Sequence, residues 1–356
     1  MIKELRKKID AIDRNILTLL NDRMKLSAEI GKIKRATSSQ IFVPVREKEI
    51  ISNILKFNNN MIPNEALVEI YKEIMNASRL LQKKFKVAYF GPEATFTHLA
   101  AIKVFGRNVD YMSADSIKDV FCEVDKSRAD YGVVPVENST EGVINHTLDM
   151  FIDSDNKIVS EIFLEVSHCL LSKEKSLKSV RKIYSHLQPI AQTRMWIEKN
   201  LKSAQVVETV STAVAARKAA VEKGTAAIAS SFAGEMYGLN ILARNIEDCR
   251  NNFTRFLVIG KHDSPPSGSD KTSIMFSVKD RIGVLHDALL PFKKYGINLT
   301  KIESRPTKKR AWEYIFFVDL KGHKDQKDVK SAIRQLSKSC MSLKILGSYP
   351  ADKLGY

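Results

Sequence analysis

The sequence predicts a multidomain protein in which an all-helical segment comes first, an α/β segment second and a ferredoxin-like βαββαβ segment last. Three observations predict this order: apolar residues recur at steps of three and four over residues 5–81, strand-like runs alternate with helical stretches from Lys86, and a βαββαβ pattern follows a polar stretch. A chain of 356 residues is also long enough for two or three domains. We expect domains at 1–85, 86–260 and 271–356, with a linker at 261–270.

Composition and charge are those of an ordinary globular protein, with 44% hydrophobic and 28% charged residues. The four cysteines lie far apart without a CxxC pair, so neither disulfides nor a zinc site are indicated. The first residues lead straight into a periodic helix, and no window is long and apolar enough to span a membrane, so we expect a cytoplasmic protein with no membrane partner. The formal charge of +16 permits polyanionic partners, but the lysines are spread along the chain, and no nucleic-acid partner is expected.

The amino-terminal segment is predicted to form three amphipathic helices. Its longest apolar stripe runs from Leu5 to Ile33 without a proline, which predicts a helix of about 45 to 50 Å. Two shorter helical patterns follow Pro44 and Pro63. Because three helices with so little apolar surface need partners, we expect this segment to dimerise.

Polar residues fall on the expected inner face of these helices. Arg23 follows Leu19 by four residues and so continues the apolar stripe, while Lys34, Ser78 and Gln82 border or continue apolar rows. A single arginine there could lie at the edge of the stripe and extend into solvent. Four inward polar residues instead indicate a site for an anion, because a buried arginine requires a negative partner.

This pattern resembles that of the all-helical chorismate mutases. The matching residues are Arg6, Arg23, Lys34, Arg46, Glu47, Ser78 and Gln82. The resemblance implies that arginines hold the two carboxylates of chorismate, that Lys34, Gln82 and Glu47 are the catalytic residues, and that Arg6 reaches the site of a partner subunit. Val43 stands where many relatives carry aspartate, which we expect to alter the local loop. The alternative is a degenerate mutase segment that serves only as a dimerisation arm.

Five polar clusters lie at the ends of predicted strands in the central segment, where α/β proteins usually bind ligands. They are residues 91–98, 136–142, 185–192, 211–213 and 251–256. Each alone could be turn chemistry or helix capping, whereas five together indicate a site. Ser185 and His186 raise the alternative of a hydrolase, but no Gly-x-Ser-x-Gly motif surrounds the serine. No metal, ATP or dinucleotide motif is present, so no cofactor and no metal are expected.

Taken in order, these clusters resemble the prephenate dehydratases, including their Thr-Arg-Phe run. The resemblance places prephenate-binding positions at Glu137, Asn138, Ser185, Gln192, Thr254, Arg255 and Phe256. It also implies two α/β lobes like those of the type 2 periplasmic binding proteins, with the site in the cleft between them. Threonine is too weakly acidic to be a strong acid, so Thr254 is the expected catalytic residue as a hydrogen-bond donor to the departing hydroxyl. Arg255 could hold a carboxylate and Phe256 is expected to pack, while Ala94 and Thr193 depart from the usual Gly and Cys.

The carboxy-terminal segment is predicted to contain strands at 273–278, 297–303, 312–320 and 343–346 and helices at 285–295 and 328–336. Two motifs stand out, at 280–286 and 296–306, although each could be structural, with glycine in a turn. They resemble the phenylalanine-binding motifs of the ACT domains attached to prephenate dehydratases. The residues that this resemblance implies around an effector site for L-phenylalanine at a subunit interface are Gly283, Val284, Leu285, Asn298, Leu299, Glu303, Ser304 and Arg305.

Together, the three resemblances imply a bifunctional enzyme of L-phenylalanine biosynthesis that converts chorismate to prephenate and prephenate to phenylpyruvate, as a homodimer or dimer of dimers inhibited by phenylalanine. A ligand-sensing transcription regulator is a rival, but a helix-turn-helix needs short helices, and the first helix here is unbroken to beyond Ile30. A catalytically inactive phenylalanine sensor is a second rival, which the retained Asn138, Gln192 and Thr254 disfavour.

Overall fold

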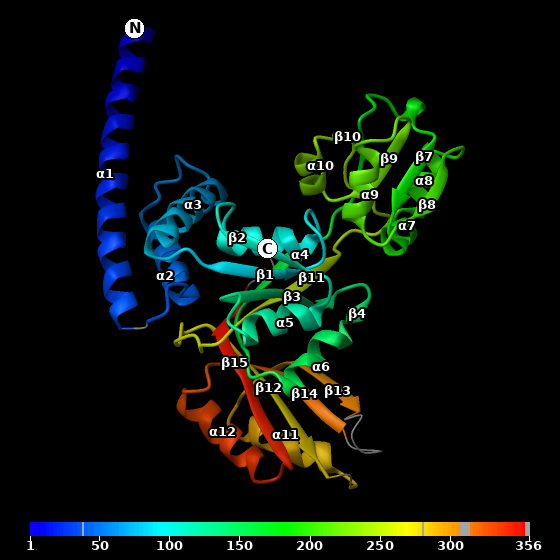
Figure 1. Ribbon diagram of the computed structural model, residues 1–356. Helices are drawn as coiled ribbons and strands as arrows, with labels where there is room; N and C mark the ends of the chain where they lie inside the picture. The colour runs from blue at the N-terminus through cyan, green and yellow to red at the C-terminus, as the bar shows by residue number, and fades with distance from the viewer. Residues whose placement is uncertain (38, 280, 307–313, 353–356) are drawn as a thin grey trace. The chain divides into compact units, whose positions relative to one another are not determined.

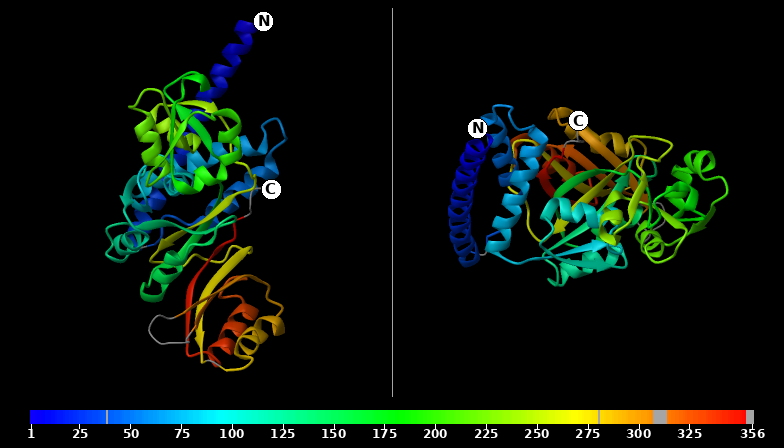
Figure 2. Two further views of the ribbon diagram at one scale, coloured as in Figure 1. Left: turned by 90° about the vertical axis from the view of Figure 1, so that its right-hand side faces the viewer. Right: turned by 90° about the horizontal axis from the view of Figure 1, so that it is seen from above.

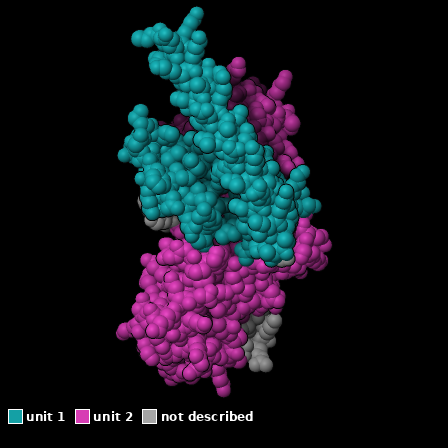
Figure 3. All heavy atoms as spheres, turned by 90° about the vertical axis from the view of Figure 1, so that its left-hand side faces the viewer, with its two compact units in different colours: residues 1–86, 105–110 teal, residues 87–104, 111–356 magenta. Residues whose placement is uncertain are grey.

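A computed structural model describes residues 1–37, 39–279, 281–306 and 314–352. The chain divides into two compact units, marked in Figure 3. Unit 1 comprises residues 1–86 with 105–110, and unit 2 comprises 87–104 with 111–356. Asp280 and Trp312, which belong to a predicted motif and a predicted strand, lie outside the described residues.

The three predicted helices of the amino-terminal segment are confirmed. They are α1 (Ile2–Ala36), α2 (Pro44–Phe57) and α3 (Asn64–Gln82), labelled in Figure 1. Helix α1 is continuous over 35 residues. Helix α2 begins at Pro44, whose fixed φ suits a first helical turn, and Val43 at its N-cap makes no side-chain capping bond.

Most of the apolar stripe of α1 is not covered by the other helices. Its residues from Leu5 to Ile33 are 49–68% exposed, and α1 packs on α3 through a different face, which includes the buried Ser27 and Gly31. A Cβ atom on Gly31 would lie 2.8 Å from the Cα of Gln82, so only glycine allows this approach of the two helices. In a single chain the stripe therefore forms an inner face only at its carboxy-terminal end, where Leu26 and Ile30 line a cavity together with Arg23 and Lys34, whereas its residues from Leu5 to Leu19 are exposed.

The first lobe of unit 2 is a mixed sheet with helices around it. Its elements are β1 (Lys86–Phe90), α4 (Phe96–Phe105), β2 (Asp110–Ala114), α5 (Ile117–Asp125), β3 (Tyr131–Asn138), β4 (Gly142–Val143), α6 (Asn145–Asp153), β5 (Lys157–Glu165) and β11 (Phe253–Gly260). The strands lie in the order β2-β1-β3-β11-β5, with β4 paired to β3. Strand β11 runs antiparallel to both of its neighbours, β3 and β5.

The second lobe lies between β5 and β11 in the sequence. Its elements are β6 (Cys169–Ser172), a 3-10 turn (Leu177–Ser179), β7 (Lys182–Ser185), α7 (Leu187–Gln192), α8 (Arg194–Asn200), β8 (Gln205–Glu208), α9 (Thr212–Ala219), β9 (Thr225–Ala229), α10 (Ser231–Tyr237) and β10 (Asn240–Ala243). The strand order is β10-β6-β9-β7-β8. The chain crosses between the lobes after β5 and again before β11, which confirms the expected two-lobed α/β fold.

The carboxy-terminal segment has the predicted βαββαβ order. It consists of β12 (Asp270–Val278), α11 (Val284–Lys294), β13 (Leu299–Pro306), β14 (Tyr314–Lys321), α12 (Lys327–Ser337) and β15 (Ser342–Pro350). The strands form an antiparallel sheet in the order β13-β14-β12-β15, and α11 and α12 cover one face of it, as Figure 2 shows.

The other face of this sheet packs against the first lobe. Alternate residues of a strand point to opposite faces, so Phe316 and Val318 contact the two helices, whereas Ile315 and Phe317 join the hydrophobic core of the first lobe. The polar stretch expected as a linker is also held, because the Ser264 hydroxyl donates to the Val159 carbonyl at 2.8 Å. The first lobe and the carboxy-terminal sheet therefore share a core.

Candidate active sites

A cavity of about 390 Å³ lies among the three helices of unit 1. Six of the seven residues expected around chorismate line it: Arg23, Lys34, Arg46, Glu47, Ser78 and Gln82. Arg6 does not line it and lies in the exposed first turns of α1. The fold thus brings together side chains from α1, α2 and α3 that the sequence placed on three separate helices.

Hydrogen bonds hold several of these side chains in place. Arg23 donates to the Ser78 hydroxyl, which donates to the Ile74 carbonyl at 2.8 Å. The Gln82 amide donates from Nε2 to the Ser27 hydroxyl at 2.9 Å, and its buried Oε1 has no partner among the described residues. An unsatisfied buried amide oxygen in a cavity wall is a group to which a ligand can donate a hydrogen bond.

Arg79 also lines this cavity, and sequence analysis missed it. Its guanidinium is 5.1 Å from the centre of the Phe42 ring, and its Nη1 is 3.1 Å from Glu47 Oε1. The signal was present in the sequence, because Arg79 follows the buried Met75 by one helical turn and precedes Gln82 by three residues.

The charges in this cavity favour an anionic ligand. Four of its lining residues are Arg or Lys and one is Glu47. Burial raises the pKa of Glu47, although Arg79 and Lys34 oppose this effect, and burial lowers the pKa of Lys34 against the opposing charge of Glu47. The net positive charge suits a ligand with two carboxylates.

A second cavity, of about 470 Å³, lies in the cleft between the two lobes of unit 2. Four of the residues expected around prephenate line it: Asn138, Gln192, Thr254 and Phe256. The first lobe supplies Asn138, the second lobe supplies Gln192, and β11 supplies Thr254 and Phe256. Among the lining residues none is Lys or Arg.

Asn138 fixes the orientation of Thr254. Its Oδ1 accepts from the backbone N–H groups of Thr140 and Glu141 at 2.9 and 3.0 Å, so its Nδ2 must be the end that faces Thr254. Nδ2 donates to Thr254 Oγ1 at 2.8 Å and to Asn252 Oδ1 at 2.7 Å. Since Thr254 Oγ1 accepts from Asn138, its own proton remains available for a ligand in the cavity.

Several lining residues of the cleft were not selected from the sequence. His168 Nε2 lies 2.9 Å from Gln192 Oε1, and Asn252 Nδ2 donates to the same oxygen at 3.4 Å. Glu141, within one of the quoted clusters, lies 3.4 Å from Gln192 Nε2, and burial raises the pKa of its carboxyl group. His168 stands in an apolar run without a motif, so only the fold reveals its position.

Three residues expected around prephenate do not line the cavity: Glu137, Ser185 and Arg255. Ser185 is fully buried, and its hydroxyl donates to the Ile228 carbonyl at 2.8 Å. Arg255 lies on β11 between Thr254 and Phe256 and points to the opposite side of the strand.

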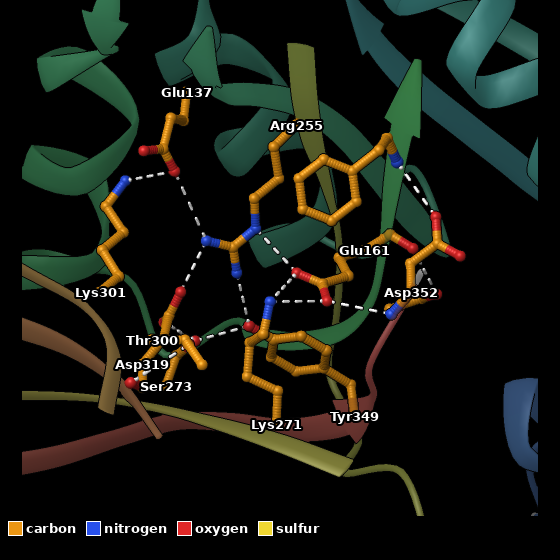
Figure 4. A network of polar contacts seen from close by, with 12 residues as sticks. Glu137, Glu161, Arg255, Lys271, Ser273, Thr300, Lys301, Asp319, Tyr349 and Asp352 are labelled. Carbon is orange, nitrogen blue, oxygen red and sulfur yellow. Dashed lines mark hydrogen bonds and ion pairs between the residues drawn. The ribbon is translucent and has the colours of Figure 1, made fainter. Parts of the chain in front are cut away.

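Arg255 is held in a buried polar network, which Figure 4 shows. Its Nε donates to Glu161 Oε2 at 2.7 Å, its Nη1 to Asp319 Oδ2 at 2.6 Å and its Nη2 to the Tyr349 hydroxyl at 2.9 Å. These partners come from β5, β14 and β15, so Arg255 links the first lobe to the carboxy-terminal sheet. The expectation that Arg255 holds a substrate carboxylate has no support from this position.

Two lysines extend this network. Lys271 Nζ lies 2.8 Å from Glu161 Oε1, and Lys301 Nζ lies 2.8 Å from Glu137 Oε2. Arg255, Lys271 and Lys301 thus pair with Glu137, Glu161 and Asp319, and Asp352 joins the network through its backbone N–H, which donates to Glu161 Oε1 at 3.0 Å (Figure 4). Burial raises the pKa of Asp319, but the Arg255 guanidinium, the Ser273 hydroxyl and Lys271 together outweigh burial and hold that pKa below its ordinary value.

The residues expected around an effector lie at three places in the carboxy-terminal domain. Gly283, Val284 and Leu285 are at the start of α11, Asn298 and Leu299 at the start of β13, and Glu303, Ser304 and Arg305 at its end. Gly283 has a φ of 76°, a conformation that favours glycine.

In the first lobe, Ala94 of the 91–98 cluster has a φ of 68°, a conformation that also favours glycine.

Strand β13 is the edge strand of its sheet, and one side of it contacts the first lobe. Lys301 bonds to Glu137, and Arg305 Nη2 donates to Asp149 Oδ1 at 3.2 Å. Glu303 lies between these two residues in the same alternation. The motif expected to bind an effector is thus tied directly to the first lobe.

These features define a class: a multidomain protein with a cationic cavity in its helical domain, a second polar cavity in the cleft of a two-lobed α/β domain, and a ferredoxin-like domain packed on the first lobe. Among the described residues no helix could span a membrane, and no cluster of His, Cys, Asp or Glu could hold a metal ion.

Comparison with known proteins gives the family. Family models match chorismate mutase type II over residues 5–83, prephenate dehydratase over 87–264 and the ACT domain over 272–338. The bifunctional chorismate mutase/prephenate dehydratase of Aquifex aeolicus is 55% identical over 353 residues, which are 98% of each chain. The chain belongs to the family of bifunctional chorismate mutase/prephenate dehydratases.

Two solved structures resemble about three quarters of this chain. A prephenate dehydratase of Arthrobacter aurescens in complex with L-Phe is 29% identical, with a TM-score of 0.70, over 75% of this chain and 90% of that one. A protein described as GqqA, a novel type of quorum quenching acylase, is 28% identical, with a TM-score of 0.70, over 76% of this chain and all of that one.

Proposed function

We propose that unit 1 converts chorismate to prephenate and that the cleft of unit 2 converts prephenate to phenylpyruvate, within L-phenylalanine biosynthesis. The observation that carries this proposal is the Asn138–Thr254 pair, which presents a free hydroxyl proton in a cavity between two lobes. Supplying chorismate and following prephenate and phenylpyruvate together tests it. Formation of neither product would overturn it.

The mutase reaction is a pericyclic rearrangement, so its site needs shape and charge rather than a nucleophile. We assign Arg23 and Arg46 to the carboxylates of chorismate, and Lys34 and Gln82 to the ether oxygen as negative charge grows on it. Glu47 orients Arg79, and both lie in the cavity wall. A degenerate mutase segment remains the alternative, and it predicts turnover of prephenate but not of chorismate.

Lys34→Ala is expected to lower kcat/KM for chorismate by about 100- to 1,000-fold, because it removes a cation from the developing negative charge. The measurement is chorismate disappearance, with phenylpyruvate formation from supplied prephenate as the internal reference. The exposed Lys32 on the same helix provides a matched control, Lys32→Ala. Equal losses in the two variants would contradict the role of Lys34.

In the dehydratase reaction, the electrons of the breaking carbon–carboxylate bond enter the ring as the ring hydroxyl leaves. Thr254 donates a hydrogen bond to that hydroxyl, Asn138 positions Thr254, and Gln192 offers its amide to the substrate. Phe256 supplies apolar surface. Hydrolysis of the acylase kind is not supported, because the Ser185 hydroxyl is buried and donates to the Ile228 carbonyl.

We further propose a homodimer formed through α1. The exposed apolar stripe from Leu5 to Ile33 needs a cover, and a second copy of the stripe would provide one. Arg6, which is exposed, would then reach the partner's cavity. Sedimentation of the intact protein tests this, and a monomer at micromolar concentration would contradict it.

The four unpaired cysteines support a cytoplasmic location.

L-phenylalanine is the proposed effector, bound beside β13 at an interface between copies, where the strand edge is free within the described sheet. Lys301 joins this strand to Glu137, the neighbour of Asn138. Effector binding can therefore reach Thr254 through Lys301, Glu137 and Asn138. Such a path requires that phenylalanine binds one arrangement of β13 better than another.

Lys301→Met is expected to raise the phenylalanine concentration for half-inhibition by about tenfold, within the usual range of coupling free energies. Turnover without phenylalanine should stay within about twofold, because Lys301 does not line the cleft. Lys321→Met, at an exposed position on β14, is the control. Unchanged inhibition in Lys301→Met would rule out this path. Calorimetry with phenylalanine, run in parallel, tests whether the effector binds at all.

A further inference from the structure

His168 is a buried histidine in the cleft that the assigned reaction steps do not use. It stands between β5 and β6, only 1% of its surface is exposed, and it lines the same cavity as Thr254. The Phe96 ring stands edge-on to it, with centroids 6.0 Å apart. Its one side-chain hydrogen bond among the described residues joins Nε2 to Gln192 Oε1 at 2.9 Å.

The hydrogen-bond chain across the cleft determines which atoms donate. Asn138 Oδ1 accepts from two backbone N–H groups, so Asn138 Nδ2 donates to Asn252 Oδ1. Asn252 Nδ2 then faces Gln192 and donates to Gln192 Oε1. That oxygen can only accept from His168, so the imidazole carries its proton on Nε2.

This assignment also fixes the amide of Gln192. Oε1 is occupied by His168 and Asn252, so the Nε2 donors of Gln192 are turned to the other side, where Glu141 Oε1 lies at 3.4 Å. His168 Nδ1 is left unprotonated and has no partner among the described residues. Burial lowers the pKa of the His168 imidazole, although the hydrogen bond to Gln192 and the nearby Glu247 oppose this effect.

We propose that His168 is a positioning residue of the dehydratase: its Nε2–H holds Gln192 Oε1 and so turns the amide nitrogen of Gln192 to the other side, where one N–H faces Glu141 and the other can donate to the prephenate in the cleft. The inference rests on the proposed substrate-binding role of Gln192. Without His168 the amide of Gln192 can rotate and present its oxygen to an anionic substrate. The substrate then loses a hydrogen-bond donor and is repelled by the amide oxygen.

Three substitutions at this position test the proposal. His168→Leu is expected to lower kcat/KM for prephenate by about 10- to 100-fold. His168→Gln, whose side-chain amide can still donate to Gln192, is expected to stay within about threefold of the wild type. His168→Asn keeps an amide that is too short to reach Gln192 and is expected to resemble His168→Leu. If His168→Leu does not fold, comparing His168→Gln with His168→Asn still tests the proposal.

A double-mutant cycle separates positioning from general damage. If His168 acts through Gln192, His168→Leu should lower kcat/KM little further in a Gln192→Leu background. Chorismate turnover by unit 1 of the same chain should remain unchanged. His323 is also 1% exposed and lies far in sequence from the cleft residues, so His323→Leu is the matched control. At temperatures below its melting point, this variant should have the dehydratase kcat/KM of the wild type.

The outcomes are distinguishable. Wild-type activity of Gln192→Leu would overturn the role of Gln192 and this inference with it. If Gln192→Leu is impaired while His168→Leu is fully active, the inference alone is overturned. Equal impairment of His168→Gln and His168→Asn, or fully additive losses in the double mutant, would also overturn it. The expected result is that His168→Gln keeps activity, His168→Asn loses it, and the losses in the double mutant are not additive.

Discussion

Replacement of Thr254 by alanine is expected to lower kcat for phenylpyruvate formation by about 100- to 1,000-fold, the usual effect of removing one donor to a developing oxyanion. The Thr254 hydroxyl accepts from Asn138 Nδ2 at 2.8 Å, so its own proton is directed to the substrate. This bond strengthens as the ring hydroxyl departs, so the loss should fall on kcat more than on KM.

The fold should survive this substitution. Asn138 Nδ2 keeps its bond to Asn252 Oδ1, and its Oδ1 keeps both backbone donors. Thr254→Ser retains the hydroxyl and should keep most of the activity, while chorismate turnover should be unchanged in both variants. Near wild-type kcat in Thr254→Ala at saturating prephenate would remove Thr254 from the mechanism.

Replacement of Arg255 by methionine is expected to destabilise unit 2 by about 3–5 kcal/mol, because it leaves buried charges without a partner. Glu161 is fully buried and Asp319 nearly so, and Lys271 alone would remain to balance them in place of two cations. Urea unfolding followed by a probe in unit 2 measures the loss. Arg194→Met, which breaks an exposed pair with Glu198, should cost about 0–1 kcal/mol.

The pH dependence of this loss has a definite sign. In the wild type the pKa of Asp319 lies below its ordinary value, so its contribution to stability is present above the unfolded pKa and is lost as pH falls through the folded one. In Arg255→Met the buried carboxyl groups are stabilised by protonation instead. The difference between wild type and variant should therefore be largest near neutral pH and shrink in acid.

Dehydratase kinetics decide between the two assignments of Arg255. Its side chain lies outside the cleft, so the folded variant should keep its KM for prephenate within a few-fold. A KM that rises strongly at unchanged stability would instead restore the expectation, drawn from the sequence, that Arg255 holds a substrate carboxylate.

Strand geometry explains which residues of the Thr-Arg-Phe run reach the substrate cavity. Thr254 and Phe256 line it, and Arg255 between them points to the other side of β11. This alternation was predictable, because neighbouring side chains of a strand face opposite ways. What sequence could not provide is the identity of the partners, since Glu161 lies 94 residues before Arg255 and Asp319 lies 64 after it.

In the helical segment, too, the sequence predicted the elements but not what they pack against. Spacing of apolar residues predicted α1, α2 and α3, because a helix repeats every 3.6 residues whatever it packs against. It did not predict that the apolar stripe of α1 is exposed and that Gly31 faces α3, since periodicity identifies a face but not its neighbour.

By itself, the sequence determined the element order and the three domain types, because local periodicity and short motifs depend on neighbours along the chain. Only the tertiary structure decided that Arg79 joins the mutase cavity, that His168 holds Gln192, and that Arg255 joins two domains. Each of those roles depends on a distant partner, and burial makes the partner obligatory, since a buried charge or amide needs its counterpart nearby.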